Sequence, residues 1–353
     1  MSTLRDVAKK AGVSVATASR VASGGDNVRP DTRSKVERAM RELLYVPPGR
    51  RTTTGVIGLL VPELANPIFP ALAQAIETRA APSGLASILC NTASAAYREV
   101  DYVHMLLDRG VDGMIFISCE MTNLSGDHGH YARLIAEGAR IVFVNGALTG
   151  VDVPSVGVDE RTAGELATRH LIELGHTRIG FVAGPEHYLP TQLKAGGREA
   201  AMLAAGLVPN GLVSFCEFSV DGGRLALARL LRHAEPPTAV ICSSDVMAIG
   251  VLQEAARRGL RVPEDLSVVG YDNSVFSRLH RLSLTTIDSH SAEVGRVAGR
   301  MLTARLDGDE GTAETRLLSP ALIPRSSTGP AVEVAPNLTP TAGRSAASSR
   351  SRR

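Results

Sequence analysis

Short apolar runs alternate with longer segments of helical periodicity over most of the chain. In the first half the apolar runs are VIGLLVP, ASILCNT, GMIFIS and RIVFVN, and helices are expected over 67–81, 97–109 and 131–137. The alternation then restarts, with the runs RIGFVAG, LVSFCEF, TAVICSS and LSVVGYD and with helices expected over 162–174, 191–205, 222–233 and 245–258. Strands that alternate with helices form βαβ units and parallel sheets. The pattern therefore predicts two similar α/β lobes that begin near Val56.

Residues 1–48 follow a different pattern, with three short helices and small apolar side chains. Thr3 and Asp6 have the spacing of a capping box, in which a hydroxyl and a carboxylate each satisfy a backbone amide at the start of a helix. Gly12 suits a turn, Ser14 can cap a second helix, and Pro30 can begin a third. Two short helices joined by a tight glycine turn predict a helix-turn-helix.

Charge is distributed unevenly along the 353 residues. The formal net charge is only +2, but residues 1–51 contain eleven Lys and Arg against five acidic residues. Residues 331–353 contain four Arg and one Glu, so the region between these two segments carries a net charge of −7. A basic head on an acidic body predicts a polyanion as the partner of the head alone.

Composition and motifs argue against several classes of protein. No apolar run reaches the length that spans a bilayer, and the polar start MSTLRDVAKK lacks the apolar core of a signal peptide, so we expect the cytoplasm. The four cysteines (Cys90, Cys119, Cys216 and Cys242) are far apart and lack zinc-ligand spacing, which favours free thiols. Because no nucleophile elbow, phosphate-binding glycine loop or metal-ligand cluster is evident, we expect no enzymatic activity, no cofactor and no metal.

The first helices also carry a family resemblance. Residues 3–47 read TLRDVAKKAGVSVATASRVASGGDNVRPDTRSKVERAMRELLYVP, which closely resembles the DNA-binding head of the lactose/galactose repressor (LacI/GalR) family. The resemblance implies that the second helix enters the major groove, where Val15, Ala16 and Arg20 read bases. A plain three-helix bundle with solvated arginines is the alternative that the pattern alone leaves open. The full set of expected DNA contacts is Thr3, Ser14, Val15, Ala16, Thr17, Ser19, Arg20, Arg29, Arg33, Arg50 and Arg51.

The body shares this resemblance to about residue 328. It is carried by segments such as NPIF, VGVDERTAG, HLIELGHTRIGFVAGP, PPTAVICSSDVMAIG and GLRVPEDLSVVGYDN. The resemblance implies a two-lobed core like that of periplasmic binding proteins, with two parallel-sheet, Rossmann-like subdomains, which dimerises and binds a small-molecule effector. Open parallel sheets bind ligands at the C-terminal ends of their strands. By alignment with the family, the effector contacts are Phe69, Asp159, Lys194, Phe218, Ser244 and Asp272.

The body departs from the family at several of these positions. Lys194 stands where the family usually has Arg, and Arg198 stands where it has an apolar residue. The ammonium of lysine is a compact point charge, whereas the guanidinium of arginine is planar and can donate two parallel hydrogen bonds. The pocket is therefore expected to recognise its ligand differently. Asp159 is alternatively the cap of the helix that follows, and Phe69 and Phe218 are alternatively core residues.

The segment LLYVPPGRRTTTGVIG joins head and body, and it is five or six residues shorter than the family norm. It lacks the family's hinge helix with its minor-groove Leu, because Pro47, Pro48 and Gly49 disfavour a helix. We therefore expect Arg50 and Arg51 to contact DNA as an extended arm and to bend the operator less. The expected domains are a head (1–48), a short linker (49–55), a core (56–328) and a disordered basic tail (329–353).

These patterns together predict a DNA-binding transcriptional regulator, most plainly a repressor, associated with the nucleoid. Its partners are expected to be double-stranded operator DNA, a sugar-like effector and a second copy of the chain, or three further copies in a tetramer. Two alternatives stay open: a repressor that needs a purine-type corepressor, and a cytoplasmic small-molecule-binding protein with weakened DNA binding.

Overall fold

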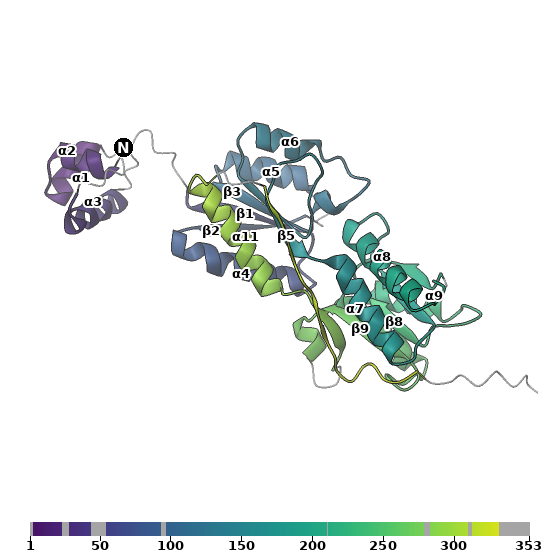
Figure 1. Ribbon diagram of the computed structural model, residues 1–353. Coiled ribbons are helices and arrows are strands. Elements are labelled where there is room, and N and C mark those ends of the chain that lie inside the picture. Colours follow the sequence, from purple (N-terminus) through teal and green to yellow (C-terminus); the bar gives the residue numbers. More distant parts are fainter. Residues whose placement is uncertain are drawn as a thin grey trace, which may run out of the picture. The chain divides into compact units, whose positions relative to one another are not determined.

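The computed structural model describes residues 3–22, 28–43, 54–92, 97–209, 211–278, 283–309 and 313–331. The chain divides into two compact units, Met1–Gly55 and Val56–Arg353, and each has its own hydrophobic core (Figure 1). Arg50 and Arg51, most of the linker and the expected tail from residue 332 onward lie outside the described residues. None of the described helices is long and apolar enough to span a membrane.

The first unit is a three-helix head, as the sequence predicts. Its helices are α1 (Leu4–Ala11), α2 (Val15–Ala22) and α3 (Pro30–Glu42). Thr3 and Asp6 form the expected capping box, and Gly12 ends α1 in the left-handed conformation that glycine adopts without strain. Each helix contributes two or three buried residues to the centre, among them Val7, Ala18 and Val36. Small side chains on α2 allow the three helices to pack closely.

The first lobe of the second unit is a six-stranded parallel sheet with helices on both faces. In spatial order its strands are β11 (Thr315–Leu318), β5 (Ser155–Val158), β4 (Ile141–Val144), β3 (Gly113–Ile117), β1 (Val56–Val61) and β2 (Ala86–Asn91). Its helices are α4 (Ile68–Ala80), α5 (Glu99–Asp108), α6 (Gly129–Ala136) and α11 (Ser291–Leu306). Ile57 and Leu59 pack under α4 and α11, whereas Leu60 packs under α5 on the opposite face. This alternation follows from the two-residue period of a strand.

The second lobe repeats the architecture. In spatial order its strands are β12 (Ala321–Ile323), β10 (Thr285–Asp288), β9 (Ser267–Asp272), β8 (Ala239–Cys242), β6 (Ile179–Ala183) and β7 (Val213–Phe215), and only β12 among them pairs antiparallel. Its helices are α7 (Glu160–Glu173), α8 (Leu189–Ala204), α9 (Val220–Leu230) and α10 (Asp245–Arg257). Three 3-10 turns complete the description: η1 (Ala81–Ser83), η2 (Glu120–Thr122) and η3 (Val275–Arg278). The predicted α/β fold class, a helix-turn-helix head followed by two parallel-sheet lobes, is confirmed.

The two lobes are not simply two consecutive halves of the chain. The chain leaves the first lobe between β5 and α7, returns between β10 and α11, and leaves again between β11 and β12. Figure 1 shows α11 lying beside α4 although the second lobe separates them in sequence. The segment between β5 and α7 contacts the segment that leaves β11, since the amide of Asp159 donates to the carbonyl of Leu318 at 3.0 Å.

Neighbouring helices of the second lobe approach closely through glycine. A Cβ added to Gly250 on α10 would lie 1.9 Å from the carbonyl oxygen of Val220 on α9. A Cβ on Gly197 of α8 would lie 2.0 Å from the carbonyl oxygen of Arg161 on α7. Because backbone atoms cannot yield as a flexible side chain can, these positions require glycine for the helices to pack this closely.

The core continues past the boundary expected at residue 328. Gly329 donates its amide to Ser267, and its carbonyl lies 3.1 Å from His176 Nε2. The amide of Ala331 donates to the carbonyl of Leu174 at 2.8 Å. Residues 329–331, expected to be part of a disordered tail, are therefore held on the second lobe. The four cysteines are free thiols as expected, although Cys216 is only half-buried.

Candidate functional site

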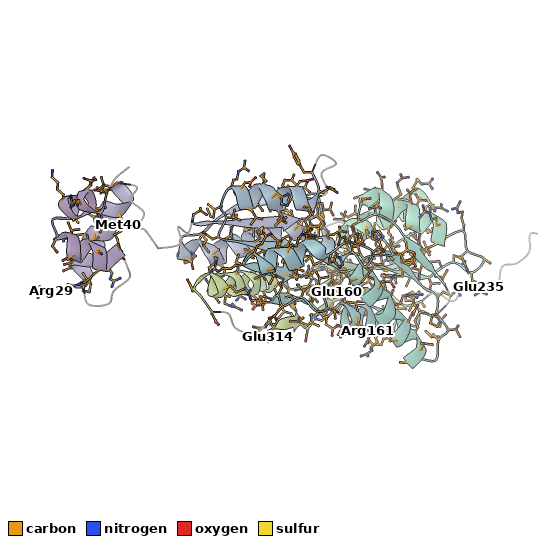
Figure 2. The ribbon with its side chains drawn as sticks, turned by 90° about the horizontal axis from the view of Figure 1, so that it is seen from above. Arg29, Met40, Glu160, Arg161, Glu235 and Glu314 are labelled. Carbon is orange, nitrogen blue, oxygen red and sulfur yellow. The ribbon has the colours of Figure 1, made fainter. Side chains whose placement is uncertain are left out.

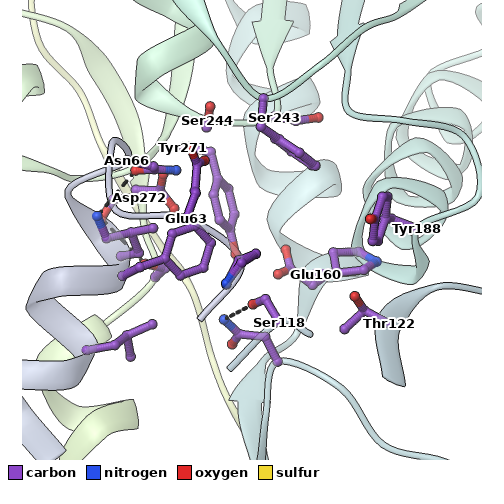
Figure 3. Close-up of a pocket in the computed structure, with 18 of the residues that line it drawn as sticks. Glu63, Asn66, Ser118, Thr122, Glu160, Tyr188, Ser243, Ser244, Tyr271 and Asp272 are labelled. Carbon is purple, nitrogen blue, oxygen red and sulfur yellow. Dashed lines mark hydrogen bonds between the residues drawn. The ribbon is translucent and has the colours of Figure 1, made fainter. Parts of the chain in front are cut away.

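A cavity of about 370 Å³ lies between the two lobes, at the C-terminal edges of both sheets (Figure 3). The first lobe contributes residues that follow β1, β3 and β4, and the second contributes residues that follow β6, β8 and β9. This volume lies within the usual range of small-molecule sites. The polar and aromatic groups of its wall are Glu63, Asn66, Phe69, Ser118, Thr122, Asn145, Glu160, Tyr188, Lys194, Glu217, Phe218, Ser219, Ser243, Ser244, Tyr271, Asp272, Ser289 and Ser291.

Three residues of this wall have left-handed backbone conformations. Ser118 after β3 has φ 49°, Asn145 after β4 has φ 61°, and Asp272 at the end of β9 has φ 112°. Such a conformation costs about 1–3 kcal/mol for a residue other than glycine and persists where the surrounding structure enforces it. The Asn145 side chain donates to Ser118 Oγ at 3.2 Å, which fixes two of the three polar groups against one another. Part of the backbone strain of the described residues therefore lies at the surface that faces a ligand.

Lys194 supplies the cavity's positive charge, and it is already paired. Its Nζ lies 2.7 Å from Glu160 Oε2 and 4.0 Å from the centroid of the Tyr271 ring. The Lys194 and Glu160 residues are only 6% and 8% exposed. Of the described residues that line the cavity, Lys194 is the only Lys or Arg, whereas four are Glu or Asp. The cavity is thus acidic, and its cation is neutralised before any ligand arrives.

Two buried carboxyl groups lie next to one another, that of Asp272 in the cavity wall and that of Asp245 behind it. Burial raises the pKa of Asp245 to about 6, although hydrogen bonds from Thr286 and Ser274 oppose this effect. Burial, and then the neighbouring Asp245 carboxylate, raise the pKa of Asp272 well above its usual value. Two carboxylates in one buried site resist simultaneous ionisation. Asp272 can therefore present a neutral hydroxyl as well as an acceptor to the cavity.

Aromatic rings form the apolar part of the wall. Phe69 lies at the start of α4, and Phe218 lies against Gly184, where a Cβ would be 2.1 Å from the ring. Tyr188 reaches the cavity from the segment between β6 and α8 (Figure 3). All three rings are half-buried, and Phe69 and Phe218 also pack against the hydrophobic cores of the first and second lobes.

Five of the six residues expected at an effector site line this cavity: Phe69, Lys194, Phe218, Ser244 and Asp272. Asp159 does not line it, because its carboxylate caps α7 by accepting from the amide and hydroxyl of Thr162 at 3.0 and 2.7 Å. Besides lining the cavity, Ser244 caps α10, because its hydroxyl accepts a hydrogen bond from the amide of Met247.

Sequence reasoning missed Glu160 and Tyr271. The sequence carried no signal for Glu160, because its pairing with Lys194 depends on the packing of α7 against α8. Arg198, where the family has an apolar residue, is 2% exposed and donates to the carbonyl of Ile179 at 2.7 Å. It lies inside the second lobe and does not line the cavity.

The head presents a polar and basic surface on α2. Ala18, Val21 and Ala22 face the core of the head. The residues of the segment that are exposed are Ser14, Val15, Ala16, Ser19 and Arg20. The other expected DNA contacts are Thr3 and Arg29, which are exposed, and Thr17 and Arg33, which are half-buried. Figure 2 shows Met40 inside the head and Arg29 at its edge.

The exposed face of α2 therefore gathers the side chains predicted to read bases. The hydroxyl of Ser14 caps the helix by accepting from the amide of Thr17 at 3.1 Å.

No group of three or more potential metal ligands occurs among the described residues of either unit.

Family models match both units. Residues 3–48 match the model described as bacterial regulatory proteins, lacI family, and residues 168–328 match that of the periplasmic binding protein-like domain. The HTH-type transcriptional regulator MalR of Streptomyces coelicolor is 37% identical over 335 residues, which cover 93% of this chain and 97% of that protein.

Two solved structures resemble the chain over almost its whole length. A complex of the transcriptional regulator CelR with cellobiose has a TM-score of 0.70 and 32% identity, and the match covers 93% of this chain and 100% of that one. The lac repressor dimer bound to operator and the anti-inducer ONPF has a TM-score of 0.73 and 28% identity, covering 93% and 99%. These relatives are regulators and not enzymes, as the sequence predicts.

Proposed function

This chain belongs to the lacI family of bacterial regulatory proteins and is a DNA-binding transcriptional regulator, and we propose that it is a repressor whose operator affinity is set by an uncharged carbohydrate. The observation that carries the choice of ligand is the acidic cavity with its single, already paired lysine. The site of action follows from the DNA target, so we place the protein in the cytoplasm with the nucleoid.

The head is proposed to bind the major groove through α2. Arg20 is suited to a bidentate contact with guanine, and Val15 and Ala16 are suited to thymine methyl groups. The residues suited to phosphates are Ser14, Thr17, Ser19, Arg29, Arg33 and the exposed Thr3 at the start of α1. Arg50 and Arg51 are proposed as an arm that extends these contacts.

The charge of the cavity favours an uncharged ligand. Glu63 and Glu217 line it besides the paired Glu160, whereas Asp272, whose pKa is raised well above its usual value by burial, contributes a neutral carboxyl. A ligand phosphate about 8 Å from one ionised carboxylate would be repelled by about 2 kcal/mol at an effective dielectric constant of 20. Lys194 cannot offset this repulsion without leaving Glu160. A sugar avoids the repulsion, and each of its hydroxyls can donate to a carboxylate in a bond worth about 1.5–3 kcal/mol.

The aromatic rings serve the same ligand. Phe69, Phe218 and Tyr188 offer apolar faces against which the C–H faces of a sugar ring can pack. These rings would also stack on a nucleobase, so an uncharged nucleoside or purine is the second candidate. The CelR relative was solved with cellobiose, and this supports the first candidate.

Two copies of the chain are proposed to bind one operator. The lac repressor relative is a dimer on its operator, and a dimer places two heads on the half-sites of a near-palindrome. Ligand binding between the lobes would change their separation and, through it, the spacing of the heads. Coupling of this kind is typically about 1–3 kcal/mol, which corresponds to roughly 5- to 150-fold in affinity.

A thermal-shift screen tests the choice of ligand. The full chain is mixed with neutral mono- and disaccharides, with the corresponding sugar phosphates, and with nucleosides and purines. We expect stabilisation by neutral sugars and none by their phosphates. Stabilisation by phosphates alone would refute the charge argument, and stabilisation by purines alone would select the corepressor alternative.

Truncation tests the assignment of DNA binding to the head. Because each unit has its own hydrophobic core, a chain that begins at Thr54 should fold. It should retain ligand binding and lose all binding to duplex DNA selected by the full chain. Sequence-specific duplex binding by the truncated chain would overturn the assignment.

A further inference from the structure

A loop of the first lobe reaches across the mouth of the cavity to the second lobe. The loop comprises residues 120–128, between β3 and α6. The amide of Leu124 donates to the carbonyl of His187 at 2.8 Å, and Asn123 forms an isolated antiparallel bridge with Tyr188. Thr122 and Tyr188, on the two sides of this contact, both line the cavity (Figure 3). A ligand in the cavity therefore lies directly behind this backbone contact.

The loop is held in place by a buried carboxylate. Glu99, on α5, accepts from the amide of Glu120 at 2.8 Å and hydrogen-bonds His130 at 2.9 Å. The hydroxyl of Tyr131 donates to the same carboxylate and accepts from the amide of Met121 at 3.1 Å. Glu99 is 8% exposed, so leaving these bonds unmade would be costly. Two consecutive amides of the loop are thus fixed from inside the first lobe.

The loop is also braced internally. The side chain of Asn123 donates to Glu120 Oε1 at 2.7 Å, and His128 Nε2 lies 2.9 Å from the carbonyl of Glu120. The amide of Gly126 donates to the carbonyl of Asn123 at 3.1 Å, closing a turn over residues 123–126. A braced loop loses little conformational entropy when it makes its cross-lobe contact, so the contact stabilises the closed form more effectively.

We propose that the 120–128 loop is a latch that holds the two lobes closed over the effector, and that Glu99 is a positioning residue for this latch. Glu99 does not line the cavity, so it acts on the effector only through the loop. The inference rests on the proposed function for the nature of the effector, but the latch itself requires only that the lobes open and close.

A substitution at Leu124 can remove one backbone hydrogen bond of the latch, the bond from the amide of Leu124 to the carbonyl of His187. Leu124 is the second residue of the 123–126 turn, a position that favours proline. Leu124→Pro removes the amide that donates to His187 while suiting the turn. Because the side chain of Leu124 is 57% exposed, Leu124→Ala is a matched control that keeps the amide and changes only the side chain.

Hydrogen–deuterium exchange of the full chain without ligand reads the latch directly. We expect Leu124→Pro to speed exchange about fivefold in peptides covering 185–194, the change that corresponds to a bond worth about 1 kcal/mol. Leu124→Ala should exchange like the wild type. Exchange that is equal in all three proteins would overturn the proposal.

Glu99 is tested by a conservative pair of variants. Glu99→Gln keeps an acceptor for the amide of Glu120, whereas Glu99→Leu removes both acceptors. We expect faster exchange over 119–124 and 185–194 in Glu99→Leu and partial rescue in Glu99→Gln. Faster exchange confined to α5 and α6 would show a merely structural role and contradict the proposal.

Ligand kinetics provide the second readout, with cellobiose as the probe. Leu124→Pro should raise the dissociation rate about fivefold and leave the association rate nearly unchanged, because the latch acts after closure. An unchanged dissociation rate would contradict the latch. Failure of cellobiose to bind even the wild type would count against the carbohydrate proposal, and the exchange comparison would still decide the latch.

Discussion

Removing the cation from the Lys194–Glu160 pair should destabilise the two-lobed unit far more than removing both charges. The two groups are 2.7 Å apart and nearly inaccessible to water. In Lys194→Met, a side chain of similar length and volume remains, but the carboxylate of Glu160 loses its counter-ion. In Lys194→Met/Glu160→Gln, no charge is left in the pair.

The expected loss in the single variant is about 4 kcal/mol. Breaking a buried ion pair by removing one partner typically costs about 3–5 kcal/mol, because a charge is left uncompensated. The ammonium also lies 4.0 Å from the Tyr271 ring centroid, a contact worth about 1 kcal/mol that the change removes. The double variant should lie within about 1–2 kcal/mol of the wild type, since uncharged replacements avoid the desolvation of both ions.

Urea unfolding measures these free energies. The chain contains no Trp, so the transition is followed by far-UV circular dichroism on the wild type, the two single variants and the double variant. We expect the double variant to be about 2–3 kcal/mol more stable than Lys194→Met. A single variant Lys194→Met that unfolds at the same urea concentration as the double variant would refute the reasoning, because Glu160 would then not depend on Lys194.

Three further predictions follow from the head, the second lobe and its helix packing. Arg20→Ala should relax the preference for one base pair by about 1–3 kcal/mol. Arg33→Ala should weaken binding to all sequences alike and reduce by about one the slope of log affinity against log salt concentration. Fluorescence anisotropy on selected and mutated duplexes measures both, and the reverse result would place another helix in the groove. Burial lowers the pKa of His176, so the unfolded chain binds protons more readily and stability should fall as the pH drops below about 6.5. His176→Gln should flatten this decline in melting temperature, and an unchanged slope would contradict the assignment. Gly250→Ala should cost at least about 1–3 kcal/mol in urea unfolding, because its Cβ would meet the Val220 carbonyl; a wild-type midpoint would show that α9 and α10 separate freely.

The sequence pattern predicted the strands up to β9 with one exception, β5, and predicted none of the strands beyond β9. The predicted strands are apolar runs separated by segments of helical periodicity, whereas β5 has only four residues and follows β4 without an intervening helix. The later strands β10, β11 and β12 contain only three or four residues each, and β11 exposes Thr315 and Arg316. The return of α11 to the first lobe depends on packing between distant segments, which no local pattern encodes.

The candidate site was predictable where it depended on strand ends. Polar residues that follow parallel strands share one edge of their sheet. Asn66, Ser118 and Asn145 lie at this edge of the first sheet, Asp272 lies at that of the second, and both edges line the cavity. Side-chain direction was not predictable: Asp159 turns back to cap α7, and Glu160, one residue later, faces Lys194 instead. Where α7 begins relative to α8 therefore decides which of the two acids, Asp159 or Glu160, faces Lys194.

The central claim is that a sugar bound between the lobes sets the affinity of the heads for DNA. The most direct measurement is the dissociation constant of the full chain for an operator selected from random duplexes, with and without a neutral sugar that stabilises the protein. We predict a change of at least about tenfold, which is lost in Asp272→Ala together with sugar binding. A sugar that binds the wild type and leaves its operator affinity unchanged would contradict the claim.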